Sequence, residues 1–185
     1  MQKIVIKFLK IILWIFWGIG IISLVTGTFQ RQFVYPLHYK NIIKVNADAY
    51  GLEPSLIYGI IKAESSFKVR AKSKKGAKGL MQITDSTAGY IAEKLKVVDY
   101  DIYEPETNIH FGCWYLSYLF MRFGNKETVI VAYNAGEGNV SEWLKNDEYS
   151  LDEVNLLKIP FKETNLYLKK VLNNIDRYKK YYKMK

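Results

Sequence analysis

The sequence predicts a mainly helical domain of the all-α class behind an N-terminal transmembrane helix. Three observations carry this prediction. After residue 39, apolar residues recur at spacings of three and four, the periodicity of helices with one buried face. Apolar and polar residues nowhere alternate over a long stretch, which leaves room only for a small β excursion in the loops. Residues 11–29 carry no charge.

Size and charge fit one modest domain with an appendage. Of the 185 residues 49% are apolar, which is ample for a packed core. The net charge of the whole chain is +9. The part after residue 31 holds 23 basic and 18 acidic residues, so its basic excess is smaller. A mild basic excess suits a membrane surface or an anionic polymer. No spacing typical of a nucleic-acid module is present, so we expect no nucleic-acid partner.

Residues 1–31 are predicted to form a membrane anchor. The uncharged segment approaches the ~20 residues that span a bilayer, and Lys3, Lys7 and Lys10 precede it. The positive-inside rule then makes this a single-pass protein of the cell membrane with its domain outside the cytoplasm. A cleaved signal peptide has the same features and would yield a secreted protein. Its small-residue cleavage site at residues 25–27 is a poor one, so a retained anchor is favoured.

Residues 32–38 are predicted to link the anchor to a domain at residues 39–182. Its expected helices span residues 39–50, 54–64, 86–95, 108–123, 127–134, 140–144 and 164–181. Gly51 ends the first helix and Pro54 opens the second, because proline suits the first helical turn. Asp85 is the expected N-cap of the third helix, and Gly124 closes the fourth. Glycines at positions 136 and 138 are expected to separate the next two.

Glu64 is the residue that points most directly to a chemistry. It follows Leu56, Ile57, Ile60 and Ile61 at helical spacing, so it projects from the apolar side of its helix. An acid on a buried face is costly unless it is functional or paired. Burial raises the pKa of a carboxyl group, and a carboxylic acid protonated near neutral pH is what cleavage of a glycosidic bond needs.

Five sequence blocks extend this hypothesis. They are Glu64-Ser65-Ser66-Phe67, residues 76–83 (GAKGLMQI), residues 108–116 (NIHFGCWYL), Ala132-Tyr133-Asn134-Ala135-Gly136, and residues 159–164 (IPFKET) with Tyr167. In this order they resemble the soluble-lytic-transglycosylase (SLT) domain, a lysozyme-like fold that cleaves bacterial peptidoglycan. The resemblance covers about residues 39–181.

The resemblance implies an enzyme, a carbon-oxygen lyase that cuts the β-1,4 bond between N-acetylmuramic acid and N-acetylglucosamine and leaves a 1,6-anhydromuramoyl end. Lysozyme-like hydrolysis commonly uses two carboxylates. No second acid is evident near Glu64, since Asp85 is expected to cap a helix. A single acid that then acts as a base is consistent with the family's mechanism.

The resemblance also implies the site residues. Glu64 is the expected catalytic acid, and the expected substrate-binding residues are Ser73, Gln82, Thr87, Tyr133, Asn134, Glu163 and Tyr167. The family often has a methionine two positions after Gln82, where this chain has Thr84.

Plainer roles compete at several of these positions. Tyr133 could be a core residue, Ser73 an exposed loop hydroxyl, and Glu163 a charge that favours the helix dipole. The basic run at residues 72–75 is typical of a solvated surface, with attraction to a wall polymer as the weaker alternative.

No cofactor or metal is expected. The one cysteine, Cys113, is interpreted as a small buried thiol, and no metal-ligand spacing surrounds it or the isolated His38 and His110. Two rival functions stay open beside the transglycosylase. One is a hydrolase that resembles goose-type lysozymes, and the other is a catalytically idle module that binds peptidoglycan. The expected partners are glycan strands and, through the anchor, the membrane; no protein partner is predicted.

Overall fold

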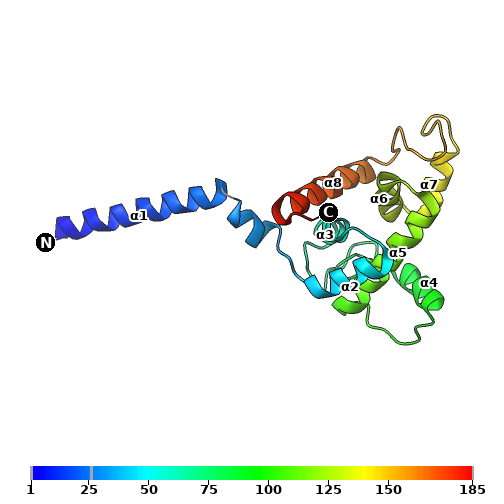
Figure 1. Cartoon of the computed structure of the whole chain (residues 1–185), viewed down its shortest axis with the longest axis horizontal. Helices are drawn as coiled ribbons and strands as arrows, with labels where there is room; N and C mark the ends of the chain where they lie inside the picture. The colour runs from blue at the N-terminus through cyan, green and yellow to red at the C-terminus, as the bar shows by residue number, and fades with distance from the viewer. Residues whose placement is uncertain (1, 26, 185) are drawn as a thin grey trace. The chain divides into compact units, whose positions relative to one another are not determined.

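A computed structural model describes residues 2–25 and 27–184 (Figure 1). Thr26, which belongs to the predicted apolar segment and to its weak cleavage site, lies outside the described residues, as do the two terminal residues. The chain divides into two compact units, Met1–Leu37 and His38–Lys185.

The first unit consists of α1 (Gln2–Val25) followed by a π-helical turn, η1 (Gln30–Val34). Within α1, the 22 residues Lys3–Leu24 have a mean hydropathy of 2.1 and none of their most apolar stretch is buried. At 1.5 Å per residue, the 22 residues Lys3–Leu24 form a helix about 33 Å long, which matches the thickness of the hydrocarbon core of a bilayer. A signal sequence would meet the same criteria. The predicted linker is partly ordered, since η1 lies at its start.

The second unit is built from seven described helices. They are α2 (Lys40–Tyr50), α3 (Pro54–Glu64), α4 (Asp85–Leu95), α5 (Pro105–Phe123), α6 (Lys126–Ala135), α7 (Glu137–Leu144) and α8 (Lys162–Tyr182). Figure 1 shows α8 running beside α3 and α6. α5 packs against α2, α4 and α6. The predicted all-α class is therefore confirmed.

Helix α3 is the centre of this unit. Its residues from Ser55 to Ile61 are all buried, so it is covered on every side rather than on one face. Gly59 makes this possible, because a Cβ atom there would meet Ile175 Cγ1 of α8 at 2.9 Å. The side chain of Asn174, also on α8, donates a hydrogen bond to the Gly59 carbonyl at 3.1 Å. The close contact of these two helices fixes the C-terminal end of α3, where Glu64 stands.

The loop between α3 and α4 contains the small β excursion. Lys78 forms isolated β-bridges with Lys72 and with Ile83. Asn108, a fully buried residue of α5, holds this loop in place by hydrogen bonds. Its Oδ1 accepts from the Met81 amide at 2.7 Å, and its Nδ2 donates to the carbonyls of Ile102 and Lys78 at 2.8 and 3.1 Å.

Three local predictions were wrong. Helix α5 begins at Pro105 rather than at residue 108, because proline suits the first helical turn. Thr84, not Asp85, is the N-cap of α4: its hydroxyl accepts from the Thr87 amide, while Asp85 forms an ion pair with Lys78 at 2.7 Å. Helix α7 begins at Glu137 rather than Val140, because Gly136, at φ 90°, makes the break alone. The caps at Gly51 and Gly124 and the start at Pro54 are confirmed.

Replacing Asn108 with alanine should lower the free energy of unfolding by about 2–4 kcal/mol, because the Met81 amide and the Ile102 carbonyl lose their buried partner and the Lys78 carbonyl loses one of its two. Chemical denaturation of the two proteins measures the difference. Asn173→Ala, at an exposed position of α8, is the matched control and should change stability by less than about 0.5 kcal/mol. Equal effects of the two substitutions would contradict the clamp assigned to Asn108.

Candidate active site

Glu64 ends α3 and is partly buried. The hydroxyl of Tyr167, on α8, donates to Glu64 Oε1 at 2.6 Å. Burial raises the pKa of Glu64 to about 7; the Tyr167 hydrogen bond and the positive charge of Lys170 act in the opposite direction but do not offset it. Lys170 is held in place by donating to the carbonyl of Ala63 at 2.6 Å. Such a carboxyl group can both give and take a proton near neutral pH.

Glu64 opens into a cleft of about 400 Å³. The other residues that line the cleft are Ser73, Lys74, Lys75, Ala77, Gln82, Thr84, Tyr133, Asn134 and Glu163. A second hollow of about 240 Å³ continues from it and shares Gln82, Thr84, Tyr133 and Asn134 with it. The hollows together are therefore long enough to take an extended ligand.

The structure brings most of the sequence-predicted site residues to these hollows. Six of the eight line the cleft itself: Glu64, Ser73, Gln82, Tyr133, Asn134 and Glu163. Tyr167 is buried and meets the cleft through its hydrogen bond to Glu64. Thr87 lines only the second hollow. Their roles toward a ligand stay predictions.

The hydrogen bonds within the site limit what each side chain can offer a ligand. Gln82 Nε2 donates to the carbonyls of Gly79 and Ala71 at 2.9 and 3.2 Å. Because these two bonds use both N–H groups of the amide, it presents only its oxygen to the cleft. The Gln82 side chain can therefore accept a hydrogen bond from a ligand but has no N–H left to donate one. Gln82 also has a positive φ of 52°, a conformation that is uncommon for a residue with a side chain.

Tyr133 and Asn134 are tied to neighbouring elements. Tyr133 donates to the carbonyl of Met81 at 2.9 Å, and its burial, together with the charge of Glu64, raises the pKa of its hydroxyl well above the ordinary value. Asn134 Oδ1 accepts from the Thr164 hydroxyl at 2.8 Å, so its amide N–H groups remain for a ligand. One donor and one acceptor, on Asn134 and Gln82, therefore line the same cleft.

Glu163 is the other acid in the lining of the cleft, and it is exposed at the start of α8. Asp85 is bound by Lys78 and does not line the cleft. The site thus has one carboxyl with a raised pKa rather than a pair that shares the work.

Sequence reasoning missed Lys170, Thr84 and Tyr115 as residues of the site. The positive charge of Lys170 lowers the pKa of Glu64 through a tertiary contact, which no local sequence pattern reveals. Thr84 was noted only as a departure from the family pattern, and Tyr115 only as part of a motif. Lys74 and Lys75, read as a solvated surface, line the cleft.

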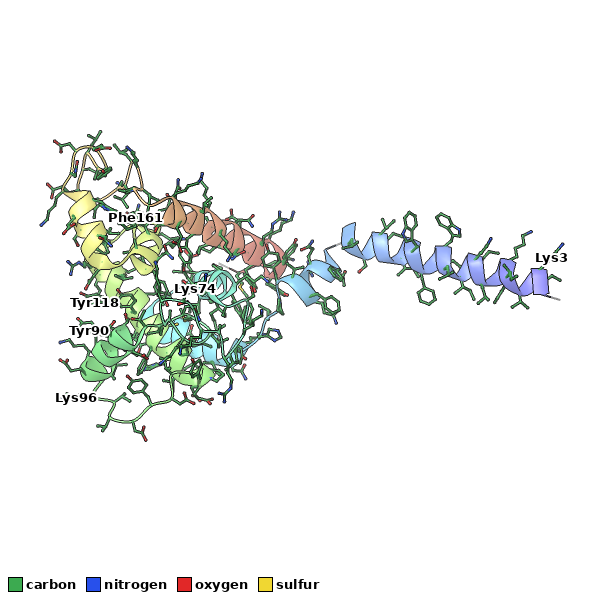
Figure 2. The ribbon with its side chains drawn as sticks, turned by 180° about the vertical axis from the view of Figure 1, so that it is seen from behind. Lys3, Lys74, Tyr90, Lys96, Tyr118 and Phe161 are labelled. Atoms are coloured by element: carbon green, nitrogen blue, oxygen red, sulfur yellow. The ribbon has the colours of Figure 1, made fainter. Side chains whose placement is uncertain are left out.

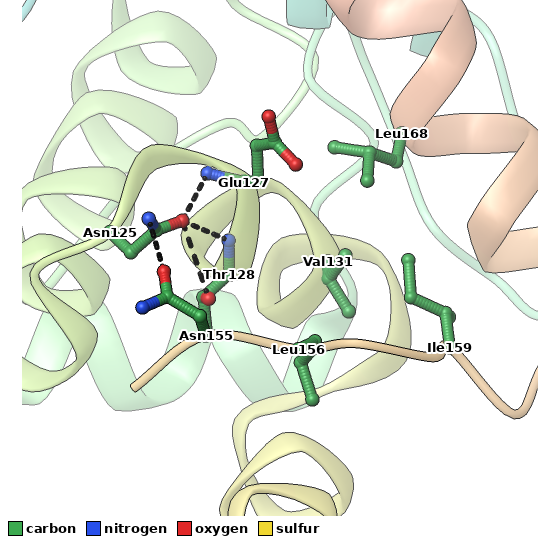
Figure 3. Close-up of a pocket in the computed structure, with 8 residues that line it drawn as sticks. All are labelled: Asn125, Glu127, Thr128, Val131, Asn155, Leu156, Ile159 and Leu168. Carbon is green, nitrogen blue, oxygen red and sulfur yellow. Dashed lines mark hydrogen bonds between the residues drawn. The ribbon is translucent and has the colours of Figure 1, made fainter. Parts of the chain in front are cut away.

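A separate hollow of about 190 Å³ lies where α6 meets α8 and the loop between α7 and α8 (Figure 3). Its amide groups are joined to one another: Asn125 Oδ1 accepts from the amides of Glu127 and Thr128, and Asn125 Nδ2 donates to Asn155. Figure 3 shows apolar side chains on its other side, namely Val131, Leu156, Ile159 and Leu168. We interpret it as a structural joint, not a reaction site.

Buried groups elsewhere offer little chemistry. Burial raises the pKa of the Cys113 thiol, which makes it a poor nucleophile. His110 Nδ1 donates to Asn46 Oδ1 at 3.0 Å, and its ring contacts Tyr50, within the interface of α5 and α2. In the part of the chain that the structure describes, no group of three or more His, Cys, Asp or Glu residues could hold a metal ion.

Comparisons with known proteins identify relatives of this chain. The sequence profile of the transglycosylase SLT domain matches residues 41–156. The soluble lytic murein transglycosylases of Salmonella typhimurium and Escherichia coli K12 are 38% and 36% identical over 144 and 154 residues. These matches cover 75% and 80% of this chain but only 22% and 24% of the relatives. A membrane-bound lytic murein transglycosylase C of Actinobacillus pleuropneumoniae is 32% identical, over 76% of this chain and 45% of its own.

Solved structures give the same result. The 70 kDa soluble lytic transglycosylase of Escherichia coli superposes with a TM-score of 0.70 at 32% identity, over 80% of this chain and 25% of that one. An inactive variant of the lytic transglycosylase Slt of Pseudomonas aeruginosa gives 0.69 at 32% identity, over 79% and 24%. The chain spans about a quarter of the length of these proteins.

The raised pKa of Glu64 makes stability depend on pH. Below the ordinary value of 4.5 both the folded and unfolded states hold the proton. Between 4.5 and about 7 the unfolded state releases it first, so wild-type stability falls as pH rises. Glu64→Gln escapes this loss. Its stability relative to wild type should increase by about 3 kcal/mol between about pH 4 and pH 8, as measured by urea unfolding.

The matched control is Glu142→Gln, which removes a carboxyl at an exposed position of α7 outside the cleft. A difference between Glu64→Gln and wild type that is constant from acid to alkaline pH would contradict the assigned pKa.

Proposed function

The chain belongs to the transglycosylase SLT domain family, and from this premise we propose that it is a peptidoglycan lytic transglycosylase. It cleaves the β-1,4 bond between N-acetylmuramic acid and N-acetylglucosamine and forms a 1,6-anhydromuramoyl product. The observation that carries the proposal is the partly buried carboxyl of Glu64, with its pKa raised to about 7, in a cleft whose lining also holds amides, hydroxyls, two lysines and the exposed Glu163.

The first step needs Glu64 as an acid. Its proton passes to the bridging oxygen, the bond to the muramoyl C1 breaks, and the N-acetylglucosamine leaves with a new hydroxyl. The muramoyl acetamido group stabilises the positive charge that develops at C1. A pKa near the ambient pH keeps a large share of Glu64 protonated for this step.

The second step needs the same group as a base. The Glu64 carboxylate takes the proton from the muramoyl 6-hydroxyl, whose oxygen closes the 1,6-anhydro ring at C1. No water is consumed, and Glu64 ends protonated as it began. Tyr167 and Lys170 favour the carboxylate between the two steps, because a hydrogen-bond donor and a positive charge both stabilise it.

The polar lining would position the sugar. The free oxygen of Gln82 suits an acetamido N–H, and the free N–H groups of Asn134 suit a carbonyl or hydroxyl oxygen. Tyr133 is assigned a packing role beside Glu64, since its hydroxyl is already engaged with Met81. The Ser73 hydroxyl accepts from the Ala77 amide at 3.0 Å, so its own O–H can still donate to a sugar oxygen.

Two alternatives give different products. A hydrolase on the same fold would leave reducing muramoyl ends, and an idle binding module would leave the strands intact. The single perturbed acid favours the transglycosylase over a hydrolase with paired carboxylates. Its raised pKa and open cleft favour catalysis over idle binding.

The full chain, incubated with purified peptidoglycan, should release fragments with 1,6-anhydromuramoyl ends, identified by mass spectrometry. Glu64→Gln should lower the rate by at least about 10³-fold, because it removes both proton transfers. The variant should still unfold cooperatively and sediment with cell walls. Reducing ends would support the hydrolase, and intact walls with wild-type protein bound would support the idle module. Substantial cleavage by the variant would refute the assignment of the acid.

Helix α1 of this chain and its similarity to a membrane-bound lytic murein transglycosylase C are consistent with a membrane or envelope location. We infer the finer arrangement that α1 is a retained, single-pass anchor. Lys3, Lys7 and Lys10 keep the N-terminus in the cytoplasm, so the SLT domain lies outside it.

Alkaline carbonate extraction followed by intact-mass measurement tests the anchor. The retained chain should stay in the membrane pellet at full mass. A soluble protein that begins near Gly27 would instead identify a cleaved signal peptide and overturn the anchor without affecting the proposed reaction.

A further inference from the structure

A rigid turn presents two lysines at the mouth of the cleft. Ser73 and Ala77 are joined twice: the Ser73 amide donates to the Ala77 carbonyl at 2.9 Å, and the Ala77 amide donates to the Ser73 hydroxyl at 3.0 Å. Gly76, at φ 83°, supplies the left-handed conformation that closes the turn. A β-bridge between Lys72 and Lys78 holds its base. Lys74 and Lys75 form the tip.

These two lysines are placed for a ligand rather than for the fold. Both line the cleft with Glu64 and both are exposed. Across the described residues no hydrogen bond or ion pair engages either side chain, whereas Lys78 on the same loop is bound by Asp85. The acids of the cleft, Glu64 and Glu163, form no ion pair with them either. Two unneutralised charges therefore border the cavity in which the proposed reaction occurs.

An ammonium group held in this way favours a carboxylate. On the substrate the nearest carboxylates belong to the lactyl group of the muramoyl sugar or to the peptide that this group carries. We propose that Lys74 and Lys75 recognise a carboxylate on the muramoyl substituent and so select the strands that the cleft accepts. This inference rests on the proposed function and names a feature of its substrate.

The contact should act on binding and not on the chemical step. Both lysines are exposed, and neither is bonded to Glu64, so they stabilise the bound strand and its transition state alike. Loss of such uniform binding raises KM and leaves kcat unchanged. Because the charges are exposed, salt should weaken their effect.

Three preparations of glycan strands separate the sources of the carboxylate. One carries peptide stems, one is stripped by an amidase to leave free lactyl carboxylates, and one is stripped and then capped as methylamides. For the double variant Lys74→Gln/Lys75→Gln, KM should rise about tenfold on a carboxylate-bearing preparation, with kcat within about twofold of wild type. An effect confined to stem-bearing strands assigns the peptide carboxylates, and an effect on stripped strands assigns the lactyl group.

Capping provides the internal check. On capped strands the KM of wild type should rise by the same factor, about tenfold, above its value on the preparation with the recognised carboxylate. The KM of the double variant should not rise further. The difference should shrink between about 0.05 M and 0.5 M salt. Equal KM values for wild type and double variant on every preparation would overturn the proposal, as would a KM of wild type that is the same on capped strands as on stem-bearing and on stripped strands.

Two single substitutions serve as matched controls. Lys72→Gln removes an exposed charge from the same loop but outside the cleft lining, and Lys96→Gln removes one at the end of α4. Figure 2 shows that Lys96 and Lys74 lie well apart on the domain. Each control should change KM by less than about twofold. An effect of Lys96→Gln as large as that of the double variant would show that only net charge matters and would overturn the proposal.

A binding measurement separates this inference from the proposed reaction. In full-length chains that also carry Glu64→Gln, the affinity for labelled strands is measured by fluorescence anisotropy with and without the two lysine substitutions. A tenfold loss of affinity for carboxylate-bearing strands would support the recognition even if wild type released no anhydro ends, which would refute the reaction alone. Normal cleavage with unchanged affinity would refute the recognition alone.

Discussion

The site depends on the hydrogen bond from Tyr167 to Glu64, which joins α8 to the end of α3 across 103 residues of sequence. Burial at the end of α3 raises the pKa of the Glu64 carboxyl, which favours its protonated form. The Tyr167 hydrogen bond and the positive charge of Lys170 both lower this pKa and so limit the rise. Either influence alone would leave a group that holds its proton too tightly or too weakly. Their balance near neutral pH lets one residue serve in turn as acid and base.

The rest of the domain maintains this balance through packing. Gly59 lets α8 approach α3 closely enough for Tyr167 to reach Glu64. On the other side of the cleft, Asn108 fixes the loop whose Met81 carbonyl receives the Tyr133 hydroxyl. Both supports are buried contacts between segments distant in sequence, so damage to either should disturb the site without removing any residue from its lining.

The all-α class and the family could be predicted from the sequence, and both are confirmed. Local signals sufficed for these, since the helix end at Gly51 and the helix start at Pro54 need only neighbouring residues. The cap at Thr84 was missed because two adjacent residues can serve, and a distant ion pair with Lys78 decided between them. Lys170 and the cleft position of Lys74 depend on tertiary contacts that no periodicity encodes. The roles of the site residues and the boundaries at residues 31 and 39 stay predictions.

The account as a whole depends on where Glu64 holds its proton, and that can be measured directly. Carbon-13 labelling of the glutamate side chains, with Glu64→Gln to assign the signal, allows the Glu64 carboxyl carbon to be titrated by NMR. The structure predicts a midpoint about 7 for this carboxyl. A midpoint near the ordinary 4.5 would leave Glu64 ionised at neutral pH and would contradict the single-residue mechanism.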